Sequence, residues 1–413
     1  MLQLIVFYFC ILFIPLNGEI KAYVTNQSGA NVSVIDESTD TVIDTIVVGG
    51  LPTGVEVSPD GSIAYVASEA TDSIRVIDTA TDTVIDSIAV GNFPVNIAFT
   101  PNGVKAYVTN FFDATVSVID VASGLETGII PVGPFPIDVS VTPNGKTVYA
   151  SIYITNTLSE IDTASDTILS TIPVGIGPNE ISTAADGTKL YVTNLISDDI
   201  SVVSTETNTV ITTIPIGIQP ISIATSPDGK KIYAGTQGVT PIDEIFVIDV
   251  ATDTVTGTIE VGNNPNGIAF TPDGTKAYVA NRFSNNVSII DAITDTNIGS
   301  IPVGSQPVGV TFTPSLTMEV AGRSQINIFA TQTAVLNRIT WSPPDGANVA
   351  EYRIFLDDSL TDPIYVVDAE SPRVFVDNSQ PPEKAYTYFV GAYNGPSFLG
   401  SGSITITPER LCK

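Results

Sequence analysis

The segment TPNGVKAYVTNFFDATVSVID, residues Thr100–Asp120, is one copy of a repeat that fills most of this chain. Its tyrosine recurs in five steps of 42 residues and one of 45. The seven copies are Tyr23, Tyr65, Tyr107, Tyr149, Tyr191, Tyr233 and Tyr278. A second marker, Ile-x-(Val/Ile)-Gly, keeps the same spacing and ends at Gly49, Gly91, Gly133, Gly175, Gly217, Gly262 and Gly304. Two independent markers therefore count seven repeats.

Each repeat holds four short runs rich in Val, Ile, Thr and Tyr, a composition typical of β-strands. In the third repeat these runs are Val95–Phe99, Lys105–Thr109, Thr115–Ile119 and Gly128–Val132. Turn-forming residues such as Pro101-Asn102-Gly103 separate them. Four strands repeated seven times predict an all-β fold, a seven-bladed β-propeller with four-stranded blades.

The repeat resembles the YVTN family of β-propeller repeats, which occurs in secreted and surface-layer proteins. The tetrapeptide is intact at residues 23–26, 107–110 and 191–194 and is degenerate in the other repeats. The resemblance covers about 295 of the 413 residues, from Ile20 to Pro314. It implies the propeller fold but says little of function, because propellers support binding, scaffolding and catalysis alike.

The order of strands within the repeats predicts how the ring closes. The first repeat starts at Lys21–Thr25, the second strand of a blade, and lacks the strand that should precede it. A matching strand follows the last repeat, at Val308–Phe312. Because an open ring would leave unpaired strand edges, we expect Val308–Phe312 to pair beside Lys21–Thr25.

The repeat period ends after Pro314, and the composition changes. Segments Arg338–Asp358 and Tyr386–Gly395 resemble a fibronectin type III domain. The resemblance puts Trp341 where that family has its core tryptophan and Tyr386 where it has its corner tyrosine. We therefore expect a second domain, a β-sandwich, over residues 319–413.

The first sixteen residues, MLQLIVFYFCILFIPL, are almost wholly apolar. This run is shorter than a membrane span and has the length of a signal-peptide core. It lacks a preceding Lys or Arg, and Leu16-Asn17-Gly18 is an imperfect cleavage site. A signal peptide over residues 1–18 and an uncleaved N-terminal anchor therefore both stay open. Either predicts a secreted, periplasmic or cell-surface protein without an integral membrane domain.

Composition excludes several classes of function. The 16 basic and 44 acidic residues give a net charge of −28, which argues against nucleic acid as a partner. The many aspartates at strand ends indicate turn hydrogen bonds, with cation binding as the alternative. The chain has no histidine, so a Ser-His-Asp triad, a histidine base and histidine-ligated metal or heme sites are excluded. The two cysteines, Cys10 and Cys412, form no disulfide framework.

Residues that vary between repeats are the candidates for function. Ligands of propellers usually meet the loops that surround one mouth of the channel. Aromatic residues gather in these loops in adjacent blades, at Phe93, Phe111, Phe112, Phe135 and Tyr153. Such a sector would suit an extracellular or envelope protein or a glycan as partner. The alternative is that the rings only pack into neighbouring loops.

Acidic residues on the innermost strands form a second candidate site. Asp138 and Glu180 occupy one register in neighbouring repeats, and Glu56 lies two residues beyond that register in its own repeat. Carboxylates near the axis could hold Ca²⁺ through oxygen ligands. Hydration by channel water explains them equally well.

These observations lead to two interpretations. The first is an exported, non-enzymatic recognition or scaffold protein without a cofactor. The alternative is a metal-dependent propeller hydrolase of the lactonase type, in which a carboxylate-bound cation activates water. That enzyme would need Asp138, Glu180, Glu56 and Asn96 to converge at one end of the channel, whereas a binding protein would keep its informative residues on the rim.

Overall fold

The structure is a computed structural model that describes residues 20–314 apart from 218 and 238–242, together with the backbone of the strands between 320 and 406. Contacts divide the chain into two compact units, and the unit Glu19–Pro314 contains all seven repeats. The predicted signal segment, residues 1–18, lies outside the described residues. Among the described residues, no helix is long and apolar enough to cross a membrane.

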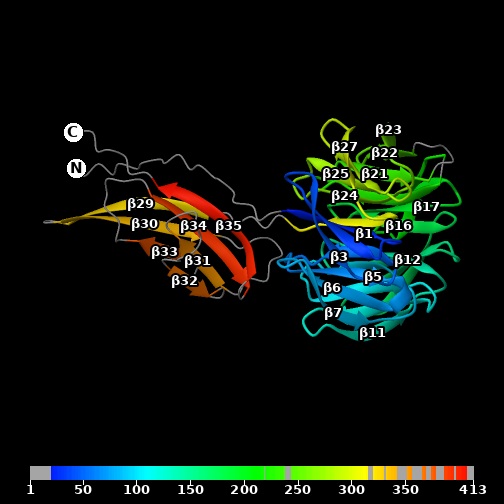
Figure 1. Cartoon of the computed structure of the whole chain (residues 1–413), viewed down its shortest axis with the longest axis horizontal. Helices are drawn as coiled ribbons and strands as arrows, with labels where there is room; N and C mark the ends of the chain where they lie inside the picture. Colours follow the sequence, from blue (N-terminus) through cyan, green and yellow to red (C-terminus); the bar gives the residue numbers. More distant parts are fainter. Residues whose placement is uncertain are drawn as a thin grey trace. The chain divides into compact units, whose positions relative to one another are not determined.

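Seven four-stranded antiparallel sheets form the propeller (Figure 1). Within each blade the four strands follow one another from the innermost to the outermost, and adjacent strands in that order are hydrogen-bonded. Blade 1 consists of β28 (Pro307–Phe312), β1 (Lys21–Asn26), β2 (Asn31–Asp36) and β3 (Thr41–Val47). Blade 2 consists of β4 (Pro52–Val57), β5 (Ile63–Ser68), β6 (Ser73–Asp78) and β7 (Thr83–Ala89), with a short 3₁₀ helix η1 (Glu69–Thr71). Blade 3 consists of β8 (Pro94–Phe99), β9 (Lys105–Asn110), β10 (Thr115–Asp120) and β11 (Leu125–Pro131).

The other four blades repeat the same order. Blade 4 consists of β12 (Pro136–Val141), β13 (Thr147–Ile152), β14 (Thr157–Asp162) and β15 (Thr167–Pro173). Blade 5 consists of β16 (Pro178–Thr183), β17 (Lys189–Asn194), β18 (Asp199–Ser204) and β19 (Thr209–Pro215). Blade 6 consists of β20 (Pro220–Thr225), β21 (Lys231–Thr236), β22 (Asp243–Asp249) and β23 (Thr254–Val261). Blade 7 consists of β24 (Pro265–Phe270), β25 (Lys276–Asn281), β26 (Asn286–Asp291) and β27 (Thr296–Pro302).

The two ends of the repeat region share blade 1, which confirms the predicted closure. β28 pairs with β1 in antiparallel register, with Thr311 opposite Tyr23 and Val310 opposite Val24. Beyond the strand, the backbone N–H of Lys21 donates to Oγ1 of Thr313 at 2.9 Å. Strands from opposite ends of the repeat region therefore complete one sheet and leave no open blade.

The tyrosine of every repeat is buried at the junction with the next blade. In blade 5, Tyr191 Oη donates to Oδ1 of Asp253 at 2.7 Å, and Lys189 Nζ contacts the same carboxylate at 2.8 Å. Four further junctions have this Lys-Tyr-Asp arrangement, with Asp40, Asp82, Asp166 and Asp295 as acceptors. Charge-assisted hydrogen bonds therefore fasten blade to blade around most of the ring.

The aspartates that end the third strands accept hydrogen bonds within turns, which is the first of the two roles that the sequence left open for them. Asp36, for example, accepts a hydrogen bond from the backbone N–H of Ser38 at 2.7 Å. The equivalent aspartates also accept from backbone N–H groups two or three residues on, at Asp78, Asp120, Asp162, Asp249 and Asp291. Much of the acidity of the chain thus belongs to its turns.

The shared spacing of the two sequence markers has one structural cause. A Cβ atom added at Gly175 would lie 2.5 Å from Cγ of Asn194, the asparagine of the YVTN motif on the next inner hairpin. The same close approach joins Gly91 to Asn110, Gly262 to Asn281 and Gly304 to Asn26. The glycine and the asparagine are therefore two sides of one contact.

Replacing Gly175 with alanine should lower the free energy of unfolding by about 2 kcal/mol, because the new methyl group would overlap buried atoms of Asn194. Gly257→Ala is the matched control, since no atom lies within 4 Å of a Cβ there and the φ angle is not positive. That control should change stability by less than about 1 kcal/mol. Urea unfolding measures both, and equal effects would contradict the close-contact explanation.

The strands beyond Pro314 form two antiparallel sheets. One contains β29 (Val320–Phe329), β30 (Gln332–Trp341) and β33 (Val374–Asp377), in that order. The other has the order β32 (Tyr365–Asp368), β31 (Glu351–Phe355), β34 (Tyr386–Asn394) and β35 (Ser397–Ile406).

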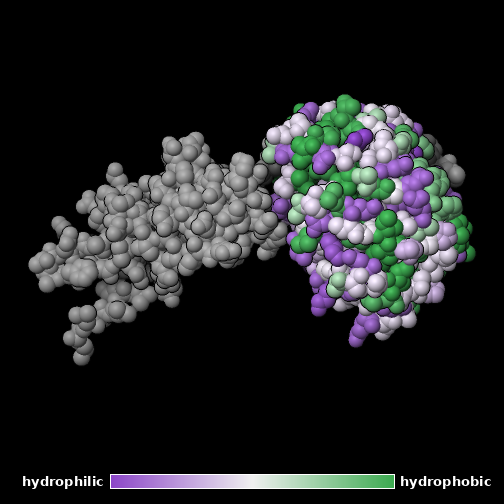
Figure 2. Space-filling model, turned by 90° about the horizontal axis from the view of Figure 1, so that it is seen from below, coloured by the Kyte–Doolittle hydropathy of each residue, from purple (hydrophilic) through white to green (hydrophobic). Residues whose placement is uncertain are grey.

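The propeller surface carries many apolar side chains. Figure 2 shows hydrophobic residues interspersed with hydrophilic ones on one face of the propeller. Large hydrophobic residues more than half exposed include Val47, Ile85, Leu125, Leu169 and Ile293. Those on outermost strands are exposed because of their place in the blade, whereas Phe112, Ile154, Ile196 and Phe283 lie in loops that follow second strands.

Candidate functional site

The innermost strands enclose a cavity of about 490 Å³ along the propeller channel. Its lining comes from the innermost strands of all seven blades, together with three residues from one mouth. Among the described residues that line it, four are acidic and one is basic, namely Glu56, Glu69, Asp138, Glu180 and Arg282. The three carboxyl residues predicted for the axis therefore meet in one cavity.

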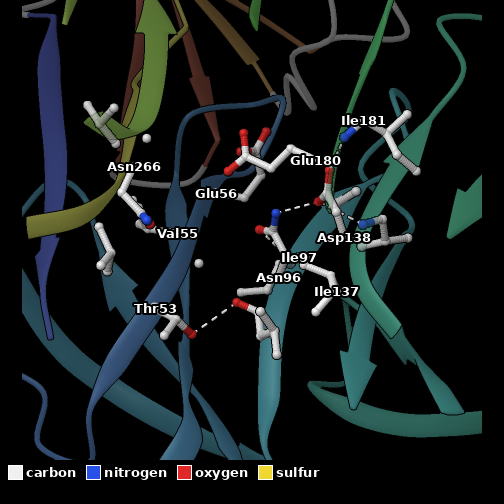
Figure 3. A pocket seen from close by; sticks show the side chains of 18 of the residues that line it. Thr53, Val55, Glu56, Asn96, Ile97, Ile137, Asp138, Glu180, Ile181 and Asn266 are labelled. Carbon is white, nitrogen blue, oxygen red and sulfur yellow. Dashed lines mark hydrogen bonds between the residues drawn. The ribbon is translucent and has the colours of Figure 1, made fainter. Parts of the chain in front are cut away.

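Asp138 is the most enclosed of these acids, with 4% of its surface exposed. Its Oδ1 accepts from Nδ2 of Asn96 and from the backbone N–H of Val139 (2.7 Å), and its Oδ2 accepts from the backbone N–H of Ile181 at 2.6 Å. A carboxylate offers about four acceptor positions, so one position on Oδ2 stays open. Figure 3 shows this carboxyl group between the inner strands of blades 3 and 5.

Hydrogen bonds from one inner strand to the next run round much of the channel wall. Glu180 Oε2 accepts from the backbone N–H of Ile223 at 2.9 Å, and Ser222 Oγ donates to the carbonyl of Pro265 at 2.9 Å. On the other side of Asp138, Thr53 Oγ1 donates to the carbonyl of Val95 at 3.0 Å. Residues at this register thus also hold neighbouring blades together.

The cavity raises the pKa of all three carboxyl groups. Burial is the largest cause for each of them, because it removes water from the charged form. The charge of Asp138 is the second cause at Glu56 and Glu180. Glu56 reaches a pKa of about 8, while three hydrogen bonds to the charged form oppose the rise at Asp138. Near neutral pH, Asp138 is therefore the group that ionises first and Glu56 keeps its proton.

Replacing Glu56 with glutamine should make the protein more stable at pH 8 but not at pH 4. Glu56 has a folded pKa of about 8 against an ordinary value of 4.5, so its contribution to stability is complete below pH 4.5 and is lost as the pH rises to about 8. The loss is at most about 1.4 kcal/mol per pH unit. Glutamine cannot ionise, so the melting temperature of the variant relative to wild type should rise between pH 5 and pH 8.

Asp249→Asn is a suitable control for that measurement. Hydrogen bonds from Thr252 hold the pKa of Asp249 below its ordinary value. Its carboxylate is then ionised in folded and unfolded chains throughout pH 5–8, so the difference in melting temperature should stay constant. A constant difference for Glu56→Gln as well would contradict the raised pKa.

Four of the five predicted rim aromatics form one cluster. The rings of Phe111 and Phe135 stack at 4.5 Å between centroids and 4° between planes. Phe93 lies 4.8 Å from Phe112 and 5.8 Å from Phe111. Tyr153 is not stacked on these rings, although its backbone N–H donates to the carbonyl of Phe135 at 3.1 Å. We call Phe93, Phe111, Phe112 and Phe135 the phenylalanine cluster.

The phenylalanine cluster packs on itself and also reaches solvent. Phe112 has 57% of its surface exposed, and the other three rings are half-buried. Ring packing and solvent exposure therefore occur together in this cluster. A binding role of these rings stays a prediction.

A polar group at the mouth was not singled out by the sequence. Arg282 Nη2 donates to Oε1 of Gln27 at 2.6 Å, and Gln27 Nε2 donates to Oε2 of Glu69 at 3.2 Å. These residues follow the second strands of blades 7, 1 and 2. Comparing that loop position across the repeats could have found them, because charged and amide side chains replace apolar ones there.

The carboxyl residues do not provide a cation site of the expected kind. Within the described part of the chain, no group of three or more acidic or cysteine residues is arranged to hold a metal ion. The reason lies in the wall, where Asp138 and Glu180 are bound to backbone N–H groups of the next blade. Asp138, Glu180 and Glu56 therefore line one cavity, but they do not form the Ca²⁺ site that the sequence suggested.

Comparison with known proteins places the chain in a family. Residues 21–315 match the model of the family described as cytochrome D1 heme domain. The chain belongs to this family. The matched region is the complete propeller, so the match runs through all seven blades. No curated protein matches the chain.

Solved structures share the propeller fold at low sequence identity. Hydrazine synthase of Kuenenia stuttgartiensis is 22% identical, with a TM-score of 0.58 over 69% of this chain and 94% of that one. A candidate 6-phosphogluconolactonase of Bacteroides uniformis is 19% identical, with a TM-score of 0.62 over 71% and 99%. Dihydro-heme d1 dehydrogenase NirN, solved in complex with DHE, is 17% identical, with a TM-score of 0.55 over 70% and 74%.

These findings correct two interpretations of the sequence. A non-enzymatic recognition or scaffold protein is contradicted, because the chain belongs to a family described as a heme domain. The expectation of no cofactor is contradicted by the same family. The non-enzymatic interpretation was wrong because the absence of histidine excludes particular catalytic groups but does not exclude catalysis.

The residues of this channel nevertheless do not fit a heme. Protein ligands of heme iron are His, Cys, Met or Tyr, and none of these is among the described residues that line the cavity. The carboxylate groups of a heme would also face Glu56, Asp138 and Glu180, with Arg282 as the one cation in that lining. No reaction step through heme is therefore assigned to this cavity.

Proposed function

We propose that the propeller is a hydrolase of the lactonase type that opens an uncharged cyclic ester in its channel. The observation that carries the proposal is the convergence of Glu56, Asp138 and Glu180 in one cavity that raises their pKa values. Groups with such perturbed pKa values in a cavity are typical of acid–base catalysis. The neighbour named as a candidate 6-phosphogluconolactonase supports lactone chemistry for this fold.

Asp138 and Glu56 have complementary roles in the proposed reaction. The open acceptor position on Asp138 Oδ2 takes a proton from water, and the water oxygen forms a bond with the carbonyl carbon. The ring C–O bond then breaks, and Glu56 gives its proton to the leaving oxygen. The product is a hydroxy acid, and the proton on Asp138 returns to Glu56 through solvent. Two carboxyl groups suffice for this cycle, without a bound cation.

The charge of the cavity favours an uncharged substrate. Asp138 is the acid of this cavity that ionises first, and its carboxylate would repel a phosphorylated or carboxylated lactone, with Arg282 as the one cation among the described lining residues. Hydrolysis turns a neutral ester into a carboxylate, which the charge of Asp138 also repels. We therefore propose a lactone without a phosphate group, unlike the phosphorylated lactone in the name of the Bacteroides uniformis neighbour.

The test is a panel of uncharged lactones and aryl esters, with proton release followed at pH 7.5 on the full chain. We expect saturable hydrolysis of at least one lactone. Hydrolysis no faster than in buffer without the protein would overturn the proposal. A parallel titration with heme, followed by its visible absorption, would favour a heme role if it showed stoichiometric binding.

We further propose that the strands beyond Pro314 form a fibronectin type III-like module. Two antiparallel sheets, of order β29-β30-β33 and β32-β31-β34-β35, support this, because the resemblance implies a β-sandwich. Tyr386 begins β34, the sixth strand of this region, as expected for its corner tyrosine. Deletion of β35 should then prevent this part from folding, as measured by protease resistance.

Export remains part of the proposal. The apolar run at residues 1–16 supports a secreted, periplasmic or cell-surface location. We also exclude nucleic acid as a partner, because the chain has a net charge of −28. An envelope protein or glycan partner stays a prediction that the described residues do not test.

A further inference from the structure

The phenylalanine cluster and the carboxyl cavity share one sector of the propeller. Phe93 stands three residues before Asn96 and Phe135 stands three residues before Asp138, each at the start of an innermost strand. Three residues of extended strand span about 10 Å. Because Asn96 donates a hydrogen bond to Asp138, the cluster lies directly along the strands that present the proposed base.

The cluster and the cavity also open toward the same mouth. β8 starts opposite the end of β9, where Pro94 pairs with Asn110, so Phe93 and Phe111 lie at one end of blade 3. Gln27 follows the end of β1, which pairs with Pro307 at the start of β28. Gln27 lines the cavity. The start of every innermost strand faces this mouth, so the phenylalanine cluster lies on its rim.

Among the described residues, the rim has apolar side chains at the neighbouring blades 3, 4 and 5 and a polar group at blades 7, 1 and 2, where Phe283 is also exposed. Beyond the phenylalanine cluster, Ile154 (53% exposed) and Ile196 (55% exposed) occupy the position of Phe112 in the next two blades. A Cβ added at Gly177 would contact both Ile196 and Tyr153 at 3.0–3.2 Å, so both side chains pack against this glycine. The group of Gln27, Glu69 and Arg282 occupies blades 7, 1 and 2 instead.

Backbone conformation adds an independent observation. Phe93 and Phe135 adopt φ angles of 60° and 59°, a left-handed conformation that is unfavourable for bulky residues. The same loop position also has a positive φ angle at Leu51, Gly177, Asn264 and Gln306, and Gly and Asn adopt it at lower cost. The loop therefore imposes this conformation, and two adjacent repeats have phenylalanine there in spite of its cost.

We propose that the substrate of the channel is a lactone with an apolar acyl or alkyl chain, which lies on the phenylalanine cluster while its ring enters the carboxyl cavity. This inference rests on the proposed hydrolase function. The apolar rim would bind the chain by removing it from water. The polar cavity would receive the ester, and the short distance between them fits one molecule that spans both.

The test uses γ-butyrolactone, γ-octanolactone and γ-dodecanolactone, which differ only in alkyl chain length. We expect kcat/KM to rise by about tenfold to a hundredfold from the shortest to the longest. In Phe111→Ser plus Phe112→Ser, and to a smaller extent in Phe112→Ser alone, that rise should shrink to about threefold or less. The quantity compared is the ratio of kcat/KM for γ-dodecanolactone to kcat/KM for γ-butyrolactone in each protein, so a general change of activity cancels.

Phe283→Ser is the matched control, because Phe283 is 54% exposed at the same loop position in blade 7, outside the phenylalanine cluster. It should keep the dependence on chain length. A rise that survives loss of Phe111 and Phe112, or that is absent in the wild type, would overturn the inference and leave the hydrolase function standing.

Binding distinguishes the two proposals if no lactone is hydrolysed. Calorimetry with 5-alkyl-2-pyrrolidinones, which cannot be opened in the same way, measures the chain dependence without turnover. Binding that strengthens with chain length and is lost in Phe111→Ser plus Phe112→Ser would support the apolar subsite while the hydrolase proposal fails. Absence of both hydrolysis and chain-dependent binding would overturn the inference.

Discussion

Replacement of Glu56 by glutamine should lower kcat/KM for lactone hydrolysis by a factor of about 10² to 10⁴, the range typical of a general acid. Glutamine keeps the size and the polarity of the side chain but has no proton to give to the leaving oxygen. The wild type should lose activity above pH 8, where Glu56 ionises, and at acidic pH, where Asp138 is protonated. The residual activity of the variant should lack the decline above pH 8.

A matched control separates catalysis from burial of a carboxyl group. Glu160 is also buried, but it lies on β14 and accepts hydrogen bonds from Ser170 Oγ (2.7 Å) and Asn208 Nδ2 (2.8 Å), away from the cavity. Glu160→Gln should therefore retain activity within a few-fold. If Glu56→Gln kept full activity and the same pH profile, Glu56 would not be the acid.

Glu56→Gln should gain stability at pH 8 while it loses activity. In many enzymes, a side chain that is needed for activity lowers the stability of the folded protein. Structural acids show the opposite behaviour, because their removal lowers stability. The two measurements together therefore test the role of Glu56 more sharply than either one does.

Truncation of the chain after Ser305 should abolish the stable monomeric propeller. This change removes β28, whose Val308, Val310 and Phe312 are each less than 10% exposed. Burial of each side chain contributes about 1.5–3 kcal/mol, and the sum is comparable with the whole stability of a typical domain. Loss of β28 also exposes the inner edge of β1.

A chain that ends after Pro314 is the appropriate control, because it keeps β28 and the rest of the propeller unit and lacks only the residues beyond that unit. Size-exclusion chromatography and thermal unfolding compare the two chains. A peptide of residues 306–314 added to the shorter chain should restore part of its stability by pairing with β1. A shorter chain that stays monomeric and melts with the control would disprove the closure mechanism.

The sequence alone was sufficient for the propeller. The repeated tyrosine and glycine give the number of blades, and turn residues divide each repeat into four strands. The displaced strand at Val308–Phe312 gives the closure. These inferences succeed because strand pairing between neighbours, turn chemistry and edge protection depend on local sequence and on simple counting. The register of Asp138 and Glu180 on innermost strands was also readable from the repeat.

The tertiary structure decided what the site can do. The pKa of Glu56 depends on burial and on the charge of Asp138, which lies two blades away. Gln27 meets Arg282, 255 residues apart, only because the ring closes. Asp138 and Glu180 bind backbone N–H groups of the next blade, which leaves them unable to form the expected cation site. Such contacts depend on distances between blades and on side-chain direction, and a repeat pattern within one chain segment contains neither.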